Sequence, residues 1–238
     1  MNIALFGYGK MGKAIEKLAV AAGHEICLIV TASTDLSDIN IKALAVDVAI
    51  EFSTPAAAYK NIRFCLENNI PVLSGTTGWL DKLSRIKDLV LAKNGAFFYA
   101  SNFSLGVNLF FKLNRELATL LAKYDYAVTI EETHHIHKKD APSGTAITLA
   151  EDIIKSTPTL KKWVTDSRAE GGGGLPILSI REGEVPGTHK ITYRNNNEEI
   201  SVEHKAKNRQ GFALGAIAVA EWIIGKTGIL AMDDFLEG

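Results

Sequence analysis

The chain has 238 residues, of which 47 % are hydrophobic and 22 % charged, a composition typical of a globular protein with one large or two modest domains. Its net charge of −1 argues against a general binder of nucleic acid or of anionic membranes, so that any attraction for an anionic ligand must be local. The longest apolar tract near the C-terminus is broken by Glu221 and is too short for a bilayer, and the unpaired Cys27 and Cys65, with a strand-like segment directly at Met1, favour a cytoplasmic protein.

The first elements are a strand, a glycine-rich turn, a helix and a second strand. Residues 2–6 and 26–31 have the apolar content of strands, and the helix between them ends at Gly23. The turn has the G-x-G-x-x-G spacing: Gly7 permits a tight turn, Gly9 lets the backbone approach a pyrophosphate, and Gly12 lets the helix pack closely on the strand. In this context the motif predicts dinucleotide binding rather than a plain glycine turn.

The second strand ends in Thr31-Ala32-Ser33-Thr34, with no acidic residue to bind an NAD ribose and no arginine to bind a 2′-phosphate. The hydroxyls of Ser33 and Thr34 can hydrogen bond to either group. The sequence therefore leaves both NADH and NADPH open as cofactors.

Further strands and helices alternate as far as residue 121. Residues 46–52, 71–74 and 96–99 are predicted strands, and residues 55–68, 80–93 and 105–121 are predicted helices, with Thr54 as a cap and Pro55 at the first helical position. Gly75-Thr76-Thr77-Gly78 is a small-residue turn at a strand's C-terminal end, where open α/β sheets bind ligands. We expect this turn to contact the cofactor; the alternative is an ordinary glycine loop.

The stretch from Glu131 to Ala146 carries the most chemistry. Three histidines and two lysines follow an alternating strand pattern, and Ser143 stands where the N-cap of the next helix is expected. The free N–H groups of Gly144, Thr145 and Ala146 would attract a carboxylate or phosphate, and a histidine can donate a proton. Two alternatives are a solvated basic loop and a zinc site at His134, His135 and His137, whose spacing is unusual for zinc.

The remainder of the chain is predicted to be mainly β-structure. Gly171-Gly172-Gly173-Gly174 indicates a flexible surface loop rather than a lid. Residues 177–181, 189–194 and 199–204 are predicted antiparallel strands, with a turn at Asn195-Asn196-Asn197. The apolar helix at residues 212–224 is expected to pack back on the first sheet.

With these residues in view, the chain resembles the 4-hydroxy-tetrahydrodipicolinate reductases (dihydrodipicolinate reductases) of the diaminopimelate route to lysine. The resemblance covers nearly the whole chain and is most specific in the central stretch. It is carried by residues 7–12, Phe52-Ser53-Thr54, 75–78, 100–104, 132–135, Lys138, 140–146 and 181–183. The chain departs from the family at Glu182, where a glycine is common, and lacks the acidic-then-basic pair that many members have after the second strand.

The resemblance implies a fold, an activity and a set of site residues. The fold is two-domain α/β: a Rossmann-type dinucleotide-binding domain (1–103 and 212–238, completed by the C-terminal helix), and an α+β substrate-binding and oligomerisation domain (104–211) with an open mixed or antiparallel sheet. The activity is NADH- or NADPH-dependent reduction of a small cyclic dicarboxylate. His134 is the implied proton donor, with Lys138 as its catalytic partner, and no metal is implied.

The implied contacts divide into two sets. The substrate would be bound by His135, Lys138, Ser143, Gly144, Thr145 and Thr77. The cofactor would be bound by Gly7, Tyr8, Gly9, Lys10, Met11, Gly12, Ser33, Phe52, Gly75, Thr76, Thr77, Ala100, Ser101, Asn102 and Phe103. The implied assembly is a homotetramer formed through the sheet of the substrate domain, without nucleic-acid or membrane partners. Two other functions remain open: a different two-domain nicotinamide enzyme, such as an aspartate or homoserine dehydrogenase, and a non-catalytic dinucleotide-binding regulator.

Overall fold

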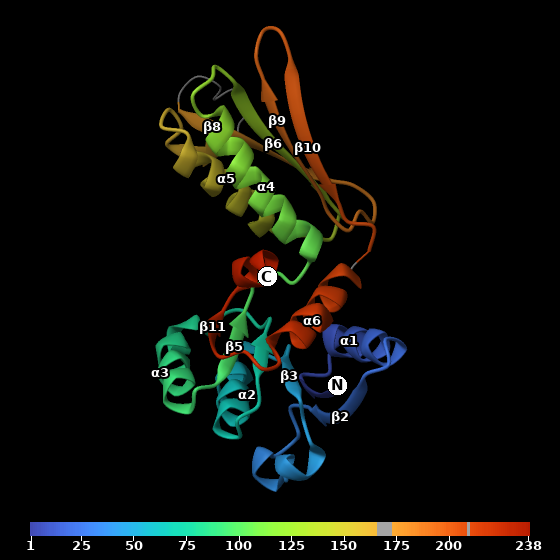
Figure 1. The fold of residues 1–238 in the computed structure, drawn as a ribbon. Coiled ribbons are helices and arrows are strands. Elements are labelled where there is room, and N and C mark those ends of the chain that lie inside the picture. The colour runs from blue at the N-terminus through green and yellow to red at the C-terminus, as the bar shows by residue number, and fades with distance from the viewer. Residues whose placement is uncertain (166–172, 209) are drawn as a thin grey trace. The chain divides into compact units, whose positions relative to one another are not determined.

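The computed structural model describes residues 1–165, 173–208 and 210–238. The chain forms two compact units, one made of residues 1–105 and 210–238 and the other of residues 106–209. Figure 1 shows the elements of each unit. Within the described residues, no helix is long and apolar enough to cross a membrane.

The first unit is a parallel six-stranded sheet covered by helices. Its strands are β1 (Asn2–Phe6), β2 (Glu25–Val30), β3 (Val48–Glu51), β4 (Val72–Ser74), β5 (Ala96–Tyr99) and β11 (Gly228–Leu230). Its helices are α1 (Lys10–Ala21), α2 (Pro55–Glu67), α3 (Leu83–Lys93), α6 (Gln210–Ile223) and α7 (Met232–Glu237), with short 3₁₀ helices at Leu36–Asp38, Ile41–Leu44 and Leu80–Lys82.

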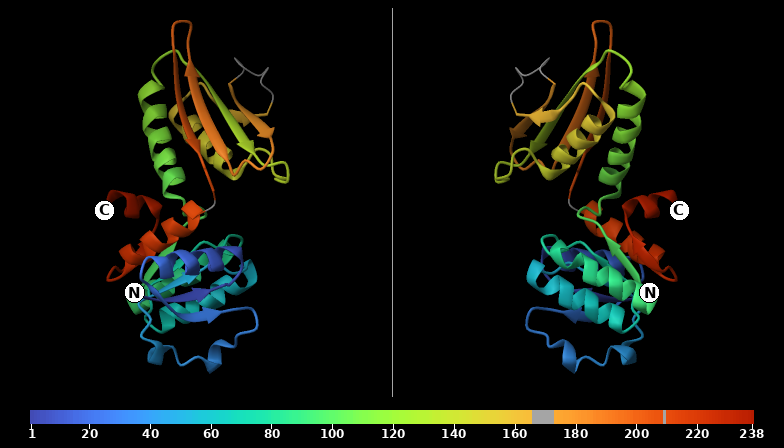
Figure 2. Two further views of the ribbon diagram at one scale, coloured as in Figure 1. Left: turned by 90° about the vertical axis from the view of Figure 1, so that its right-hand side faces the viewer. Right: turned by 90° about the vertical axis from the view of Figure 1, so that its left-hand side faces the viewer.

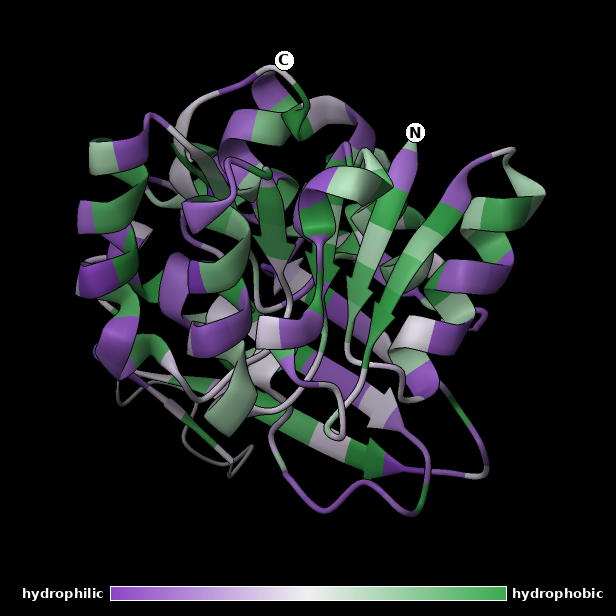
Figure 3. Ribbon diagram, turned by 90° about the horizontal axis from the view of Figure 1, so that it is seen from below, coloured by the Kyte–Doolittle hydropathy of each residue, from purple (hydrophilic) through white to green (hydrophobic). Residues whose placement is uncertain are grey.

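The strand order is β11-β5-β4-β3-β1-β2, and every pair is parallel. One face packs on α1, α6 and α7, and the other on α2 and α3. Because both faces are covered, the strands are almost continuously apolar, as their green colour in Figure 3 shows. The order of the strands reverses at β1, because β2 lies on one side of it and β3 on the other. The C-terminal ends of β1 and β3 therefore border the place where open α/β sheets bind ligands.

The second unit has a five-stranded mixed sheet in the order β10-β9-β6-β8-β7. Its strands are β6 (Ala127–His134), β7 (Lys162–Val164), β8 (Gly174–Arg181), β9 (Thr188–Arg194) and β10 (Glu199–Lys205). The helices α4 (Leu105–Leu121) and α5 (Gly144–Ser156) pack against one face, as Figure 2 shows, and bury Val128, Ile130, Ile177 and Ile191.

Several predicted features differ from the structure. The strand at 177–181 was predicted to be antiparallel, but β8 runs parallel to β6; the chain returns through α5 and β7, and a long crossover of this kind joins parallel strands. Thr54 is at the cap position of α2 without a side-chain hydrogen bond to the helix. The predicted glycine loop lies partly outside the described residues: Gly171 and Gly172 are not described, and Gly174 begins β8.

The C-terminal segment adds a strand as well as helices to the first unit. Neither β11, which pairs with β5, nor β7 is predicted from the sequence. Both strands have only three residues, too few for an alternating pattern to be recognised. Figure 1 shows β11, near the red end of the colour range, beside β5.

The dependence of the first unit on α6 can be tested at two adjacent isoleucines. Ile223 is fully buried, whereas Ile224 is 43 % exposed. Ile223→Ala should lower the free energy of unfolding by about 2–5 kcal/mol, because it leaves a cavity, and Ile224→Ala should change it by about 0.5 kcal/mol or less. Urea denaturation followed by circular dichroism measures both values. Equal losses would contradict the packing of α6 on the sheet.

Candidate active site

The glycine-rich turn joins β1 to α1. Gly7 has a φ of +99°, and a Cβ there would lie 2.1 Å from the carbonyl oxygen of Phe52. A Cβ at Gly12 would lie 2.2 Å from the carbonyl oxygen of Gly7. The chain path therefore requires glycine at both positions.

Gly9 is different, since a Cβ there would meet no described atom within 4 Å. Gly9 is the N-cap of α1, which has no side-chain cap and no acidic residue in its first turn. The first N–H groups of the helix thus keep their capacity to bind an anion. The turn fits the pyrophosphate of a nicotinamide dinucleotide.

A buried carboxylate, Glu51, connects the next two loops of the first unit. It accepts hydrogen bonds from the Ser74 hydroxyl at 2.6 Å, the Thr76 hydroxyl at 3.1 Å and the Ser53 N–H at 3.0 Å. These bonds tie the loop after β3 to the loop after β4, both of which contain predicted cofactor residues. Glu51 is not among the residues predicted from the sequence, where its signal is a single acid at the end of an otherwise apolar strand.

The other predicted cofactor residues lie at strand ends of the same unit. Phe52 and Phe103 pack together with ring centroids 5.4 Å apart, and Ala100 and Phe103 are buried, so these residues support the loops from within. Tyr8, Met11, Gly75 and Asn102 are half-buried, Thr76 is buried, and Lys10, Ser33, Thr77 and Ser101 are exposed. The Ser33 hydroxyl lies 3.0 Å from that of Thr31.

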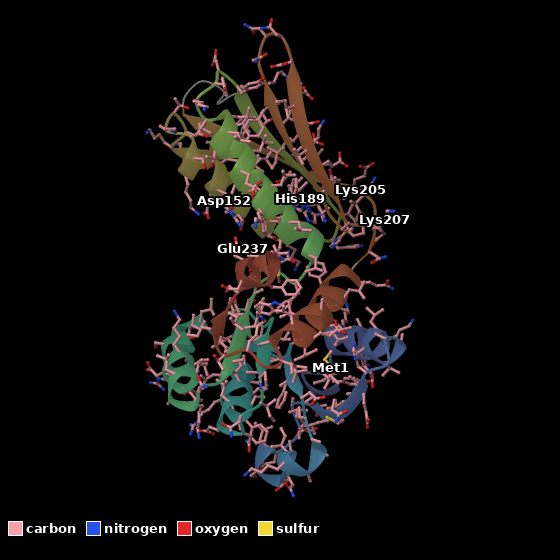
Figure 4. The ribbon with its side chains drawn as sticks, in the orientation of Figure 1. Met1, Asp152, His189, Lys205, Lys207 and Glu237 are labelled. Atoms are coloured by element: carbon pink, nitrogen blue, oxygen red, sulfur yellow. The ribbon has the colours of Figure 1, made fainter. Side chains whose placement is uncertain are left out.

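In the second unit, polar residues extend the core-facing rows of three strands. The buried row of β6 starts with Val128 and Ile130 and continues with Glu132 and His134. In register, Glu132 lies opposite His189 of β9, and His134 lies opposite Arg181 of β8. The buried row of β6 therefore changes from apolar to polar residues at its C-terminal end, next to the N-terminus of α5. His189, a member of this polar cluster, is labelled in Figure 4.

Glu132 is the centre of this cluster. Its Oε2 is in close contact with Nδ1 of His134, and its Oε1 lies 2.9 Å from Nη2 of Arg181 and 3.3 Å from the Ser143 nitrogen. Burial alone would raise the pKa of Glu132, but the hydrogen bonds from His134, Ser179 and Arg181 outweigh it and hold that pKa well below its usual value. Glu132 is therefore ionised and fixes one nitrogen of His134.

His189 is 4 % exposed, and its Nε2 lies 3.0 Å from Oγ of Ser143. Its ring meets that of His134 edge to face, with centroids 5.1 Å apart. Burial, with the proximity of His134 adding to it, lowers the pKa of His189 to about 4. This histidine is neutral at pH 7.

The predicted anion site at the start of α5 is partly as expected. Ser143 caps the helix by accepting the Ala146 N–H at 3.2 Å, so the prediction that this N–H is available to a ligand is wrong. Gly144 is exposed, and Thr145 is half-buried. The structure places Ser143 in the polar cluster through its contacts with Glu132 and His189.

Lys138 and His135 lie on the loop between β6 and α5. The ammonium of Lys138 bonds to both carboxylate oxygens of Asp140, at 2.7 and 2.8 Å. Arg181 supports this loop by donating to the carbonyl oxygens of Asp140 at 2.6 Å and Lys138 at 3.3 Å. His135 is half-buried, and its ring lies near that of His137, tilted by 42° with centroids 6.2 Å apart.

Three members of the cluster were not among the predicted site residues: Glu132, Arg181 and His189. Extending the alternation of residues 126–131 as far as residue 134 would have placed Glu132 and His134 on the buried face. His189 offered a similar signal, since it alternates with Ile191 and Tyr193 in a predicted strand.

The histidines considered for zinc are not gathered at one point. Within the described residues, the group with suitable geometry is Glu132, His134 and His189, whose ligand atoms lie within 4.8 Å of one another. Arg181 is bonded to the same carboxylate, and its positive charge opposes the binding of a cation there.

The comparison with known families covers both units. Residues 1–103 match the family described as dihydrodipicolinate reductase, N-terminus, and residues 106–236 match dihydrodipicolinate reductase, C-terminus. The chain belongs to the dihydrodipicolinate reductase family.

Several similar proteins align with nearly the whole of this chain. The 4-hydroxy-tetrahydrodipicolinate reductase of Christiangramia forsetii is 48 % identical over 99 % of this chain and 98 % of its own. The enzyme of that name from Archaeoglobus fulgidus is 35 % identical over both full chains. Among solved structures, a dipicolinate-bound dihydrodipicolinate reductase from Paenisporosarcina sp. TG-14 has a TM-score of 0.79 at 24 % identity and covers 99 % of each chain.

Gly9 provides a test of the phosphate turn. Gly9→Ala should leave the melting temperature unchanged, because the new methyl group meets no described atom, yet raise the NADH dissociation constant about tenfold or more by occupying the space of the phosphate. Gly12→Ala is the comparison, and it should lower the melting temperature through its contact with Gly7. Thermal scans and NADH fluorescence titrations measure the two effects. Unchanged NADH binding by Gly9→Ala would remove the turn from the cofactor site.

The buried neutral state of His189 predicts a dependence of stability on pH. Because its pKa is about 4 in the folded protein and about 6.5 in the unfolded chain, the unfolded chain binds the proton more tightly. The associated stability is complete above pH 6.5 and is lost as the pH falls towards 4, by on the order of 2 kcal/mol at pH 5.

His189→Gln should remove this part of the pH dependence. The matched control is His137→Gln, because the His137 side chain is 72 % exposed and its replacement should leave the dependence unchanged. Urea unfolding at pH 7.5 and pH 5 gives the comparison. The same loss of stability at pH 5 in His189→Gln and in the unmodified protein would show that His189 is protonated in the fold.

Proposed function

We propose that this protein reduces 4-hydroxy-tetrahydrodipicolinate, in its dehydrated form, to tetrahydrodipicolinate with a reduced nicotinamide cofactor. The observation that carries the proposal is the buried cluster of Glu132, His134 and Arg181 beside the N-terminus of α5. It combines a proton donor with an anion site, which the reduction of a cyclic dicarboxylate requires. Full-length relatives with this activity in their names support the same assignment.

The first unit supports binding of the cofactor, whose chemical contribution is a hydride. Residues 7–12 would hold the pyrophosphate at the start of α1, where the unpaired N–H groups lie. The loops containing Phe52 and residues 75–77 would hold the remainder, fixed by their hydrogen bonds to Glu51.

In the second unit, His134 is the proposed acid. Its Nδ1 is engaged by Glu132, so Nε2 is the nitrogen that can deliver a proton to the substrate ring. Gly187 lies beside Nε2, because a Cβ built on this glycine would be 3.1 Å from it. Glu132 thus has the role of holding the imidazole in one tautomer and one orientation.

The two carboxylates of the substrate would be bound by separate groups. Ser143, Gly144 and Thr145 offer neutral donors and a helix N-terminus, and Lys138 with His135 offers a charged site. Lys138 is paired with Asp140, whose side chain is 60 % exposed. A substrate carboxylate would exchange with Asp140, since exposed ion pairs are worth only about 0–1 kcal/mol.

The activity and its cofactor preference are tested in one assay. Substrate generated by a synthase is supplied with NADH or NADPH, and cofactor oxidation is followed by absorbance. Asp35 caps its own turn by accepting the Ser37 N–H at 3.0 Å, and the hydroxyls at residues 31–34 carry no charge. We therefore expect both cofactors to be used, with kcat/KM values within about tenfold of each other.

Two results of this assay would count against the proposal. If neither cofactor is oxidised while NADH still binds, the protein is a dinucleotide-binding regulator and not this reductase. A ratio of about a hundred or more between the cofactors would mean that a charged side chain, such as Asp35 or Lys42, reaches the ribose.

The role of His134 is tested by His134→Gln. Glutamine keeps a hydrogen-bond donor but delivers no proton at neutral pH, so kcat should fall on the order of 10²-fold. The NADH dissociation constant, measured by fluorescence, should stay unchanged. His137→Gln is the control, because His137 is exposed on the same loop, and it should keep a normal kcat. A normal kcat in His134→Gln would exclude His134 as the acid.

A further inference from the structure

Ser143 and His189 form a buried pair that the roles above do not explain. Oγ of Ser143 accepts the Ala146 N–H at 3.2 Å and lies 3.0 Å from Nε2 of His189. The two residues are 3 % and 4 % exposed. At this burial each polar hydrogen needs an identified acceptor.

The surroundings of His189 select one of its two neutral tautomers. Nδ1 is buried, and no hydrogen-bond partner for it is found among the described residues. A proton on Nδ1 would leave a buried donor unpaired, whereas a proton on Nε2 leaves only an unused lone pair. The unpaired donor is the rarer defect in proteins. The proton therefore belongs on Nε2, from which His189 donates to Ser143.

This tautomer determines where the hydroxyl proton of Ser143 can point. A hydroxyl oxygen has two lone pairs; one accepts from Ala146 and the other from His189. The hydroxyl proton then has to be donated to a third group, and no acceptor for it is found among the described residues. A carboxylate bound at the start of α5 is an acceptor of the right chemistry.

We propose that His189 is a positioning residue for substrate recognition: by donating from Nε2 to Ser143, it directs the serine hydroxyl proton towards a carboxylate of the substrate. The inference rests on the proposed function, because the carboxylate belongs to the dicarboxylate substrate. His189 acts through Ser143 and does not reach the reacting atoms. Its loss should affect dicarboxylate affinity more than the rate of the chemical step.

The test uses the matched pair His189→Gln and His189→Asn. The amide nitrogen of glutamine reaches the position of the imidazole Nε2, whereas that of asparagine stops near Nδ1. Pyridine-2,6-dicarboxylate is titrated by calorimetry into each protein with saturating NADH, and kcat and KM are measured separately. His189→Gln should stay within about threefold of the unmodified protein, and His189→Asn should raise Kd and KM about tenfold.

Two further readouts separate positioning from a general structural effect. In His189→Asn, the NADH dissociation constant should be unchanged and kcat should fall less than about threefold, a change smaller than that of KM. In a Ser143→Ala background, His189→Asn should cause no additional loss, because the hydroxyl that it directs is absent. Unchanged dicarboxylate affinity in His189→Asn, or a full additional loss in the Ser143→Ala background, would overturn the proposal.

A measurement on the unmodified protein makes the test independent of folding of the variants. The ¹⁵N chemical shifts of histidine-labelled protein at pH 7, with His189 assigned by the resonance missing in His189→Gln, should show a protonated Nε2 and an unprotonated Nδ1. A protonated Nδ1 would overturn the inference. Failure of the unmodified protein both to bind pyridine-2,6-dicarboxylate and to turn over substrate would instead count against the proposed function.

Discussion

The second unit depends on a charge that is buried and therefore has to be neutralised by its neighbours. Transferring a carboxylate from water into a protein costs several kcal/mol, and that cost is offset only if the partners are well placed. Glu132 is fully buried and has partners from three directions: His134 on its own strand, Arg181 on β8 and the backbone of Ser143 before α5. Satisfying one carboxylate therefore fixes the register of β6 and β8 and the start of α5.

The first unit also contains a buried acidic side chain, Glu51, but its hydrogen-bond partners are of a different kind. Glu51 is also fully buried at the C-terminal end of a strand, but the donors that surround it are hydroxyl and N–H groups instead of cations. These donors belong to the end of β4 and to the loops that follow β3 and β4. In both units, the contacts of a buried carboxylate with its neighbours hold loops in place, and these loops contain proposed ligand-binding residues.

The features that could be predicted from the sequence are those set by local interactions. Helix α4 begins and ends where its apolar periodicity predicted, and Ser143 caps α5 as its residue type and position indicated. The glycine turn was also predicted, because its spacing is a local pattern and Gly12 is constrained by Gly7, five residues before it. The steric demand at Gly7 itself comes from Phe52, on a distant loop.

What was missed depends on pairing between distant segments. The parallel orientation of β8 follows from the path of the chain through α5 and β7, which no local pattern encodes. His189 is 57 residues from Glu132 in the sequence (189 − 132), and it becomes significant only because the β6–β9 register places the two side chains opposite each other. A histidine in an alternating strand is otherwise typical of an ordinary half-buried position.

The two proposed carboxylate sites differ in how far they are prepared before the substrate arrives. At Ser143, the cap hydrogen bond and the contact with His189 set the direction of the hydroxyl, so little conformational freedom remains to be lost on binding. Lys138 instead holds a partially exposed carboxylate of its own chain, Asp140. This ion pair keeps the ammonium of Lys138 oriented. Because an exposed ion pair contributes little free energy, replacing Asp140 with a substrate carboxylate costs little. An incoming neutral group would have to displace Asp140 without replacing its charge, whereas an incoming carboxylate restores the same pairing. The arrangement therefore favours ligands with two anionic groups over those with one.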